Sequence, residues 1–483
     1  MSSLILIFLS SILFFALARI RLNLAVALMI FALPSYLIRF KIFGIPLTFL
    51  EVMIFISFGV WLWRDYKRII DNVKKRLQYR KKQERIGKLI RYPFDSEITM
   101  LLVVSFISII TACFTDAALG VWKAYFFEPI LFYILILNVF KGMDKKETDC
   151  YLISPLVFSA FAVSVFAIYQ KFTGAFILND FWAAEASRRV TGFFEYPNAV
   201  GLYLGPLILV MAGWVAARAK GLEFKKNDIF KKDFLKIYFV TLVIILSYIS
   251  IYFAKSEGAL LAVTFVLFLF VLFLGKKIRY AAIVLAAFVG FLVFTVPVSR
   301  DKVIEKLTLS DLSGEIRKQQ WRETWQLLTD SRANFILGTG LSGYQKNVSK
   351  FHQEGIFFNF DNDPDFNRKI VIFDDKYRGE HWQPVETYMY PHNIFLNFWV
   401  ELGFFGMILF AYLIGKFFHV AYKLYKKGSE KYLILGISGA VLVMVIHGLV
   451  DVPYLKNDLA IIFWLLFAMI GLIKTRRLLL GAK

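Results

Sequence analysis

Apolar runs of about 20 residues recur from one end of this chain to the other. The 483 residues are 58% hydrophobic and 18% aromatic, and their mean hydropathy is +0.60. A helix needs roughly 20 apolar residues to cross the hydrocarbon core of a bilayer. The sequence therefore predicts an all-α polytopic membrane protein whose main solvent is the lipid bilayer.

The number of spans depends on how the first runs are counted. Thirteen runs lie near residues 3–18, 22–38, 44–63, 99–116, 119–140, 149–170, 197–217, 236–254, 257–274, 279–298, 391–415, 432–450 and 457–473. With residues 64–98 in the cytosol, this count puts Arg39 and Lys41 outside, where basic residues are disfavoured. One of the first two runs could instead lie along the surface or be half-length. We therefore expect about 12–13 transmembrane helices.

The net charge of +21 is unevenly distributed between the loops. Residues 64–98 hold 12 Lys and Arg against 5 Asp and Glu, whereas residues 299–391 hold 13 against 14. Further short basic segments lie at 220–236, 276–279, 416–431 and 474–483. Basic short loops beside a neutral long loop follow the positive-inside rule. The charge thus predicts orientation in a membrane, and we expect no nucleic-acid partner.

This pattern predicts three regions along the chain. Residues 1–298 hold the N-terminal transmembrane helices with the basic cytosolic loop 64–98, and residues 391–483 hold the C-terminal ones. Residues 299–391 form one large extracytoplasmic loop, and a loop of this length is usually functional. Within this loop we expect a helix near 313–329, capped by Asp311 or Ser313.

The sequence gives no pattern of metal ligands. Cys113 and Cys150 lie far apart, so they form neither a disulfide framework nor a cysteine metal site. Asp361–Asp365 opens like a calcium loop, but Phe366 and Ile372 stand where such loops need Gly and Glu. We expect a solvated turn there, with a structural calcium as the alternative, and no cofactor. The first run, Leu4 to Ala18, has no preceding basic residue, and we expect no cleavable signal.

His392 is the candidate catalytic base. It stands where the long loop re-enters an apolar run, in the segment Tyr390–Gly403. Histidine titrates near neutral pH, and a helix N-terminus favours its uncharged form, which can accept a proton from a hydroxyl group. The alternative is a helix cap or an interfacial residue.

Other charged and polar residues fall at the same predicted face of the membrane. These residues are Lys123, Glu128, Arg188, Arg189, Lys255, Glu257, Arg317 and Asp451. Each alone is compatible with an interfacial anchor, but charges at membrane depth usually face protein or a water-filled cavity. Arginine binds phosphate oxygens bidentately. Several arginines without a dense carboxylate cluster therefore indicate an anionic substrate, such as a lipid-linked phosphate or diphosphate.

Several short motifs in a fixed order resemble one family. They are Arg189–Asn198 before a span, Ser256-Glu257-Gly258-Ala259 opening another, Arg317-x-x-x-Trp321 with Gly338-x-Gly340, Pro391-His392-Asn393 with Glu401-x-Gly403, and His447–Pro453. Together, from about Lys123 to Trp464, they resemble the O-antigen ligase and O-antigen polymerase (Wzy-type) superfamily of membrane glycosyltransferases. Each motif is weak alone, and their order and spacing carry the resemblance.

The resemblance implies a GT-C-like membrane fold and a transfer reaction. The enzyme would move a glycan from undecaprenyl diphosphate to an acceptor sugar, with inversion and without a metal or other cofactor. By position, His392 would activate the acceptor hydroxyl, and Arg189 and Arg317 would hold the diphosphate with Arg188 and Lys255. Lys123, Glu128, Glu257, Asn198, Glu401 and Asp451 would support them. The family commonly has Arg where this chain has Glu257, which leaves the completion of the phosphate site open.

Three functions remain open at this point. A ligase would use a lipid- or protein-anchored glycan as acceptor, a polymerase another lipid-linked repeat unit, and the arginine-bearing loop helix favours the ligase. A polysaccharide or lipid transporter would place charges along the midplane of several spans, which this chain does not do. For all three we expect the cytoplasmic (inner) membrane of a prokaryote, with an active site of the ligase or polymerase on the extracytoplasmic face.

Overall fold

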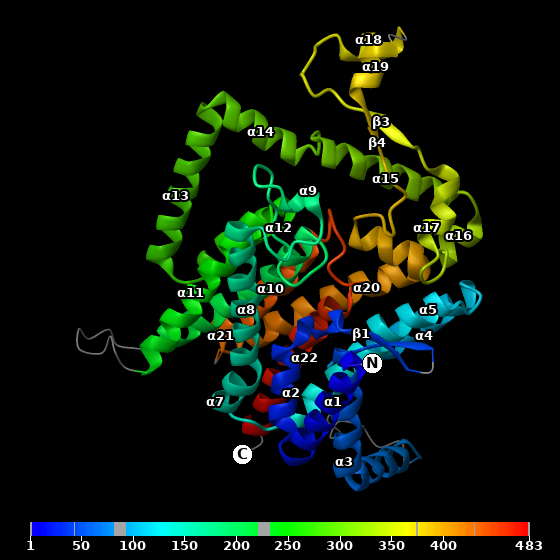
Figure 1. The fold of residues 1–483 in the computed structure, drawn as a ribbon. Helices are drawn as coiled ribbons and strands as arrows, with labels where there is room; N and C mark the ends of the chain where they lie inside the picture. The colour runs from blue at the N-terminus through cyan, green and yellow to red at the C-terminus, as the bar shows by residue number, and fades with distance from the viewer. Residues whose placement is uncertain are drawn as a thin grey trace.

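The computed structural model describes residues 2–42, 44–81, 93–220, 232–372, 375–428 and 430–481, and most of them are helical (Figure 1). Seven described helices are long and apolar enough to cross a membrane: Asp116–Val139, Lys145–Thr173, Pro197–Ala219, Asp233–Phe253, Lys276–Thr295, Ile394–Lys426 and Asn457–Leu478. Shorter apolar helices lie at Leu4–Ile20, Leu22–Phe31, Glu257–Val271 and Lys431–His447. The all-α polytopic membrane class is confirmed. The count of 12 or 13 spans stays a prediction.

The N-terminal region departs most from the expected spans. Its elements are α1 (Ser2–Ile20), α2 (Leu22–Phe31), the 3-10 turn η1 (Leu33–Leu37), and a hairpin of β1 (Arg39–Ile42) and β2 (Ile45–Thr48). The 10 residues of α2 extend about 15 Å, half the hydrocarbon core, so the second run is half-length. A continuous span over 22–38 was wrong, because Pro34 cannot extend the helical hydrogen-bond ladder. The helix expected near 44–63 begins later, at Phe49, because Gly44, at φ 81°, lies in the turn of the hairpin.

Two later spans are composite helices. Helix α5 (Asp116–Trp122) continues through the π-helical turn η2 (Lys123–Phe127) into α6 (Glu128–Val139). Likewise, α7 (Lys145–Thr148) continues through η3 (Asp149–Ile153) into α8 (Ser154–Thr173). Single π turns inside helices often occur at functional sites. The first of them begins at Lys123, one of the predicted site residues.

The remaining N-terminal helices include one member of a close helix pair. They are α3 (Phe49–Lys81), α4 (Asp95–Thr111), α9 (Asp180–Ala183), α10 (Pro197–Ala219), α11 (Lys232–Phe253), α12 (Glu257–Val271) and α13 (Lys276–Thr295). Helix α10 packs against α21 (Lys431–His447), and a Cβ on Gly213 would lie 2.7 Å from Cα of Gly436. Small residues allow such close approach of helices in a membrane. Helix α13 buries none of its residues and stands apart from this pair (Figure 1).

The long loop forms a separate layer across the top of Figure 1. Its helices are α14 (Pro297–Leu307), α15 (Leu312–Thr329), α16 (Arg332–Leu337) and α17 (Tyr344–Val348), with a 3-10 turn η5 (Ser349–Phe351). A hairpin of β3 (Gly355–Phe357) and β4 (Trp382–Pro384) then carries α18 (Phe366–Val371) and α19 (Asp375–His381) away from the bundle. The expected loop helix is confirmed as α15, and Asp311 caps it by accepting a hydrogen bond from the Gly314 backbone amide at 3.1 Å.

The C-terminal region contains α20 (Ile394–Lys426), α21 and α22 (Asn457–Gly481). Figure 1 shows the C-terminus and α7 at the lower left, opposite α18 and α19. This arrangement is compatible with the basic segments lying on one side of a membrane and the long loop on the other. The orientation in the membrane stays a prediction. Of the predicted cytosolic segments, residues 82–92, 221–231 and 482–483 lie outside the described residues.

Candidate functional site

The turn that enters α20 is fastened to two other elements. The indole N–H of Trp321 on α15 donates to the Pro391 carbonyl oxygen at 2.9 Å. The Ile394 amide donates to the Gly448 carbonyl oxygen at 2.7 Å, at the end of α21. These contacts bring α15, residues 390–393 and the segment after α21 together. We call this meeting point the His392 centre.

His392 is held in a specific orientation by α15. Its Nδ1 lies 2.9 Å from Oε1 of Gln320, and its ring stands edge-on to Tyr388, with 5.0 Å between the ring centroids. Its backbone lies in the left-handed region, at φ 45°. The cap of α20 is instead Asn393, whose Oδ1 accepts from the Phe395 and Leu396 amides at 3.0 and 3.1 Å. The cap alternative for His392 was therefore wrong.

Three charged groups act on His392, one on α15 and two in the segment between α21 and α22. Burial lowers the pKa of His392, Arg317 and Lys456 lower it further, and only Asp451 raises it. Asp451 is itself buried, and its Oδ1 accepts from the Val452 amide at 2.8 Å. Burial acts to raise the pKa of Asp451, but its interactions with His447, His392 and Lys456 and the hydrogen bond from the Val452 amide hold it below its usual value. The centre thus favours neutral imidazole beside an ionised carboxylate.

This arrangement fixes which ring nitrogen of His392 can act as a base. Because Gln320 Oε1 is an acceptor, it binds the Nδ1–H tautomer and leaves the lone pair on Nε2. Among the described residues, no hydrogen bond engages Nε2. A neutral imidazole with a free Nε2 can take a proton from a bound hydroxyl group.

Two of the predicted arginines are held mainly by backbone oxygens. Arg317 donates from Nε to the Val450 carbonyl at 3.0 Å and from Nη1 to Oγ of Ser313 at 2.8 Å. Arg189 donates from Nε to the Ala254 carbonyl at 3.0 Å and from Nη2 to Oδ1 of Asn198 at 3.1 Å. In the described part of the chain, each guanidinium keeps one terminal nitrogen without a hydrogen bond. Both are therefore oriented while retaining donors for an anionic ligand.

Arg188 and Lys255 also make backbone contacts, but they hold the loop before α10. Arg188 donates from Nε to the Ala183 carbonyl and from Nη1 to the Lys171 carbonyl, both at 3.0 Å. Lys255, at φ 51°, directs Nζ to the Ser187 carbonyl at 3.3 Å. These contacts fix the loop that carries Arg189. A diphosphate contact from Arg188 or Lys255 remains a prediction.

Glu257, the residue that departs from the family pattern, is neutralised from α14. Nζ of Lys306 lies 2.6 Å from its Oε2 and 2.8 Å from Oδ2 of Asp311, the cap of α15. Burial acts against the charge, but these two carboxylates raise the pKa of Lys306. The carboxylate at position 257 therefore joins α12 to the start of α15, which carries Arg317.

Lys123 and Glu128 belong to a separate buried cluster. Nζ of Lys123 lies 2.5 Å from Oε1 of Glu51 on α3, and it donates to the Pro46 carbonyl at 3.1 Å. Glu128 is 2% exposed, and the charged groups that act on it are Glu51 and Lys123. This cluster ties the π turn to α3 and the β1–β2 hairpin. The described residues show no direct contact between it and His392.

Glu401 on α20 fixes the loop between α16 and α17. Its Oε2 accepts from the Ser342 amide at 2.6 Å, and its backbone carbonyl accepts from the Ser108 hydroxyl. The same loop is also bound to the residue before Glu401, because the Thr339 amide donates to the Val400 carbonyl at 2.7 Å. Gly403, at φ 78° and ψ 177°, breaks the helical geometry of α20 here, and a Cβ on it would strike the Ile336 carbonyl. The glycines in these motifs thus permit close backbone packing.

Gln320 and Lys456 at the His392 centre were not among the predicted site residues, and His447 was named only as the first residue of a motif. Gln320 lies on the α15 face that the helical period assigns to the interior, and that period could have found it. His447 ends α21 with Nε2 4.0 Å from Oδ2 of Asp451. Lys456 lies over the Tyr196 ring, 5.6 Å from its centroid, and so links the Arg189 loop to the centre. Only the tertiary contacts show the roles of His447 and Lys456.

The acidic turn in the long loop is occupied by protein groups. Oδ2 of Asp363 accepts from Nζ of Lys369 at 2.6 Å and from the Tyr377 hydroxyl at 2.7 Å. These hydrogen bonds lower the pKa of Asp363 to about 2. Across the described ranges, no three His, Cys, Asp or Glu side chains lie together as a metal site would require. The absence of a metal requirement remains a prediction.

Fold and site together define a polytopic helical membrane protein, with Arg189, His392 and Asp451 between its helices and Arg317 on the loop helix α15. A family model described as O-antigen ligase (Wzy_C) matches residues 241–411, a range that contains Arg317 and His392. The resemblance to the O-antigen ligase and polymerase superfamily is thereby confirmed. The match supports ligase- or polymerase-type function on lipid-linked glycans in a membrane. No curated protein matches the chain.

Proposed function

We propose that this chain transfers a glycan from an undecaprenyl-diphosphate carrier to an acceptor sugar as a ligase, at the outer face of the cytoplasmic membrane of a prokaryote. The observation that carries the proposal is the contact between Nδ1 of His392 and Oε1 of Gln320, at 2.9 Å. This contact leaves Nε2 available as a base. It also places His392 next to α15, the loop helix that carries both Gln320 and Arg317. The O-antigen ligase family match over residues 241–411 supports the same chemistry.

The reaction needs one displacement at the anomeric carbon. The acceptor oxygen forms a bond to this carbon while the bond to the carrier phosphate breaks, and Nε2 of His392 takes the hydroxyl proton. Attack from the side opposite the phosphate inverts the anomeric configuration. The diphosphate leaves with the bond electrons, so no metal is needed to generate a nucleophile, and charge stabilisation of the leaving group is the main demand.

The arginines supply that charge stabilisation in the proposal. Arg317 and Arg189 each keep a terminal nitrogen free within the described residues, and their Nε donors are fixed on backbone carbonyls. Donors oriented before the reaction lose little entropy when negative charge develops on the leaving phosphate. Asp451 and Lys456 set the charge around the base, and Arg188, Lys255 and Asn198 position Arg189. Glu257 and Glu401 hold the elements that carry these groups, and Lys123 and Glu128 hold the π turn against α3 and the β1–β2 hairpin.

Reconstitution tests the proposal directly. The purified chain in proteoliposomes is given an undecaprenyl-diphosphate oligosaccharide with either a lipid-anchored acceptor glycan or the donor alone. A ligase yields a glycan on the acceptor lipid and free undecaprenyl diphosphate. Longer lipid-linked chains from the donor alone would make the protein a polymerase. Movement of intact donor across the bilayer without any new glycosidic bond would refute both.

A further inference from the structure

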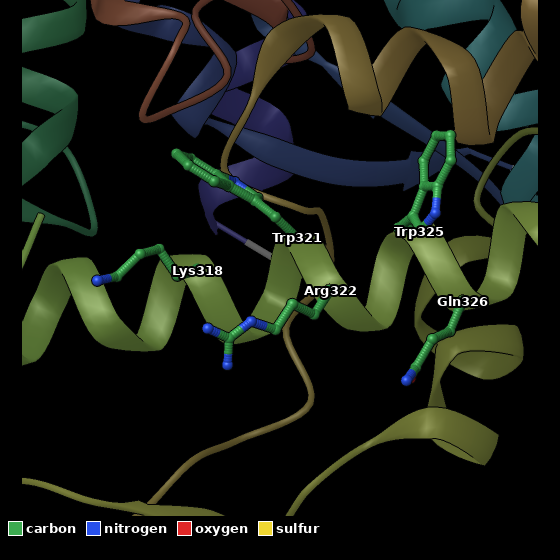
Figure 2. A pocket seen from close by; sticks show the side chains of 5 residues that line it. All are labelled: Lys318, Trp321, Arg322, Trp325 and Gln326. Atoms are coloured by element: carbon green, nitrogen blue, oxygen red, sulfur yellow. The ribbon is translucent and has the colours of Figure 1, made fainter.

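The outer side of α15 carries a groove that has no role in the reaction proposed for the His392 centre. The groove has a volume of about 500 Å³, within the range of small-molecule sites, and is lined by Lys318, Trp321, Arg322, Trp325 and Gln326. Figure 2 shows these five side chains leaving one helix at successive turns. From Lys318 to Gln326 they span nine residues of helix, or about 12 Å, which is longer than a single sugar ring.

The aromatic part of the groove suits stacking against sugar rings. Trp321 and Trp325 are four residues apart, so they lie on the same side of α15 (Figure 2). Trp325 is 50% exposed, although its ring also packs edge-on against Trp399, with 5.9 Å between the centroids. An indole that is anchored at one edge and open on the other loses little entropy when it binds a ligand.

The charged part of the groove is positive. Lys318 pairs with Glu315 at 2.6 Å, and Glu315 is not among the residues that line the groove. Arg322 is exposed, and no carboxylate pairs with it in the described part of the chain. Two cations, two indoles and one amide, with no acidic side chain in the lining, favour an anionic ligand that carries rings.

The groove is joined to the His392 centre by Trp321. The same indole that lines the groove donates its N–H to the carbonyl oxygen of Pro391, the residue before His392. A chain bound in the groove therefore passes close to the backbone of the turn that carries the proposed base. Because of this contact, the groove is structurally connected to the His392 centre, as an unrelated surface patch would not be.

We infer that this groove binds an extended anionic oligosaccharide, one with uronate or phosphate groups, and holds it beside the His392 centre. The inference rests on the proposed function and adds the substrate class to it. The anionic chain could belong to the donor glycan or to the acceptor. Both sources present the same chemistry to the groove: sugar rings for the indoles and negative charges for Arg322 and Lys318.

Binding can be measured without any transfer. The full chain in lipid nanodiscs is titrated with a hexasaccharide of alternating glucuronate and N-acetylglucosamine, and with the same hexasaccharide after reduction of its carboxyl groups. We expect the acidic probe to bind more tightly. Arg322→Gln should weaken binding of the acidic probe about fivefold and leave that of the reduced probe unchanged. Trp325→Leu should weaken binding of both.

A matched control and the transfer-dead variant make the result decisive. Arg332→Gln removes an exposed cation on α16, outside the groove, and should leave both affinities unchanged. His392→Ala should bind the acidic probe as wild type does, so binding survives even where transfer fails. Equal affinity for both probes, or equal effects of Arg322→Gln and Arg332→Gln, would overturn the inference.

Two transfer reactions identify the source of the anionic chain. One combines a donor that carries acidic repeat units with a neutral acceptor, and the other combines a neutral donor with an acidic acceptor. In one of these reactions the acidic substrate occupies the groove. In that reaction, Arg322→Gln should raise the KM of the acidic substrate about fivefold. If the KM is unchanged in both reactions while wild type transfers normally, the groove has no substrate role, and the proposed function still stands.

Discussion

Replacing His392 by Asn separates its chemistry from its conformation. The backbone of His392 lies at φ 45°, where Ala would add left-handed strain of about 1 kcal/mol, whereas Asn adopts this region readily. The amide of Asn does not titrate near neutral pH, so it cannot replace the base. We expect His392→Asn to fold normally and to lose roughly 10²- to 10⁴-fold in transfer rate, or about 3–5 kcal/mol of transition-state stabilisation.

The pH dependence gives a second test of the same base. Burial, Arg317 and Lys456 lower the pKa of His392, so the imidazole is neutral at pH 7. The wild-type rate should therefore rise with pH through a midpoint below about 6.5 and then stay constant. In Gln320→Glu, a carboxylate next to Nδ1 would favour the imidazolium form and move this midpoint up by about one pH unit or more. A structural role for His392 would give no such shift.

The assay is single-turnover transfer in proteoliposomes between pH 5 and 9. Asn393→Ala serves as the control because it removes the cap of α20, which should cost about 1 kcal/mol of stability, but keeps the base. Donor binding by His392→Asn should match that of wild type. A His392→Asn variant within fivefold of the wild-type rate, or a flat wild-type pH profile, would refute the assignment of His392 as the base.

Four further predictions follow from other parts of the structure. Arg317→Lys and Arg189→Lys should each lose about 2–4 kcal/mol of transition-state stabilisation, because the guanidinium fork is lost, and single-turnover rates would detect it. Gly403→Ala should lower the free energy of unfolding by about 2–4 kcal/mol, and with it the thermal midpoint, since its φ is 78° and its Cβ would strike the Ile336 carbonyl; an unchanged midpoint contradicts this packing. A cysteine at position 360 should react with an impermeant reagent on intact cells, and labelling only after permeabilisation would reverse the proposed orientation. Transfer should persist in EDTA; loss of activity restored by Mg²⁺, Mn²⁺ or Ca²⁺ would show a metal requirement.

Much of the architecture followed from local sequence patterns. Length and hydropathy of the apolar runs identified the membrane class, because the cost of unpaired backbone groups in lipid leaves helices as the simplest way to cross. The loop helix α15 and its cap Asp311 were predicted for a similarly local reason. The N-terminal hairpin Arg39–Thr48 was missed, since an apolar run with Pro34 and Gly44 resembles a span until its turn geometry is known.

The composition of the site was determined by tertiary structure. The motif around His392 indicated a base, but only its packing against α15 showed that Gln320 holds Nδ1 and that Asn393 is the cap. Lys456 reaches the centre from a segment more than 60 residues along the chain, so no local pattern could place it there. The physical reason is that propensity and hydropathy act within a helix, whereas a catalytic centre depends on contacts between helices whose order in sequence does not fix their neighbours in space.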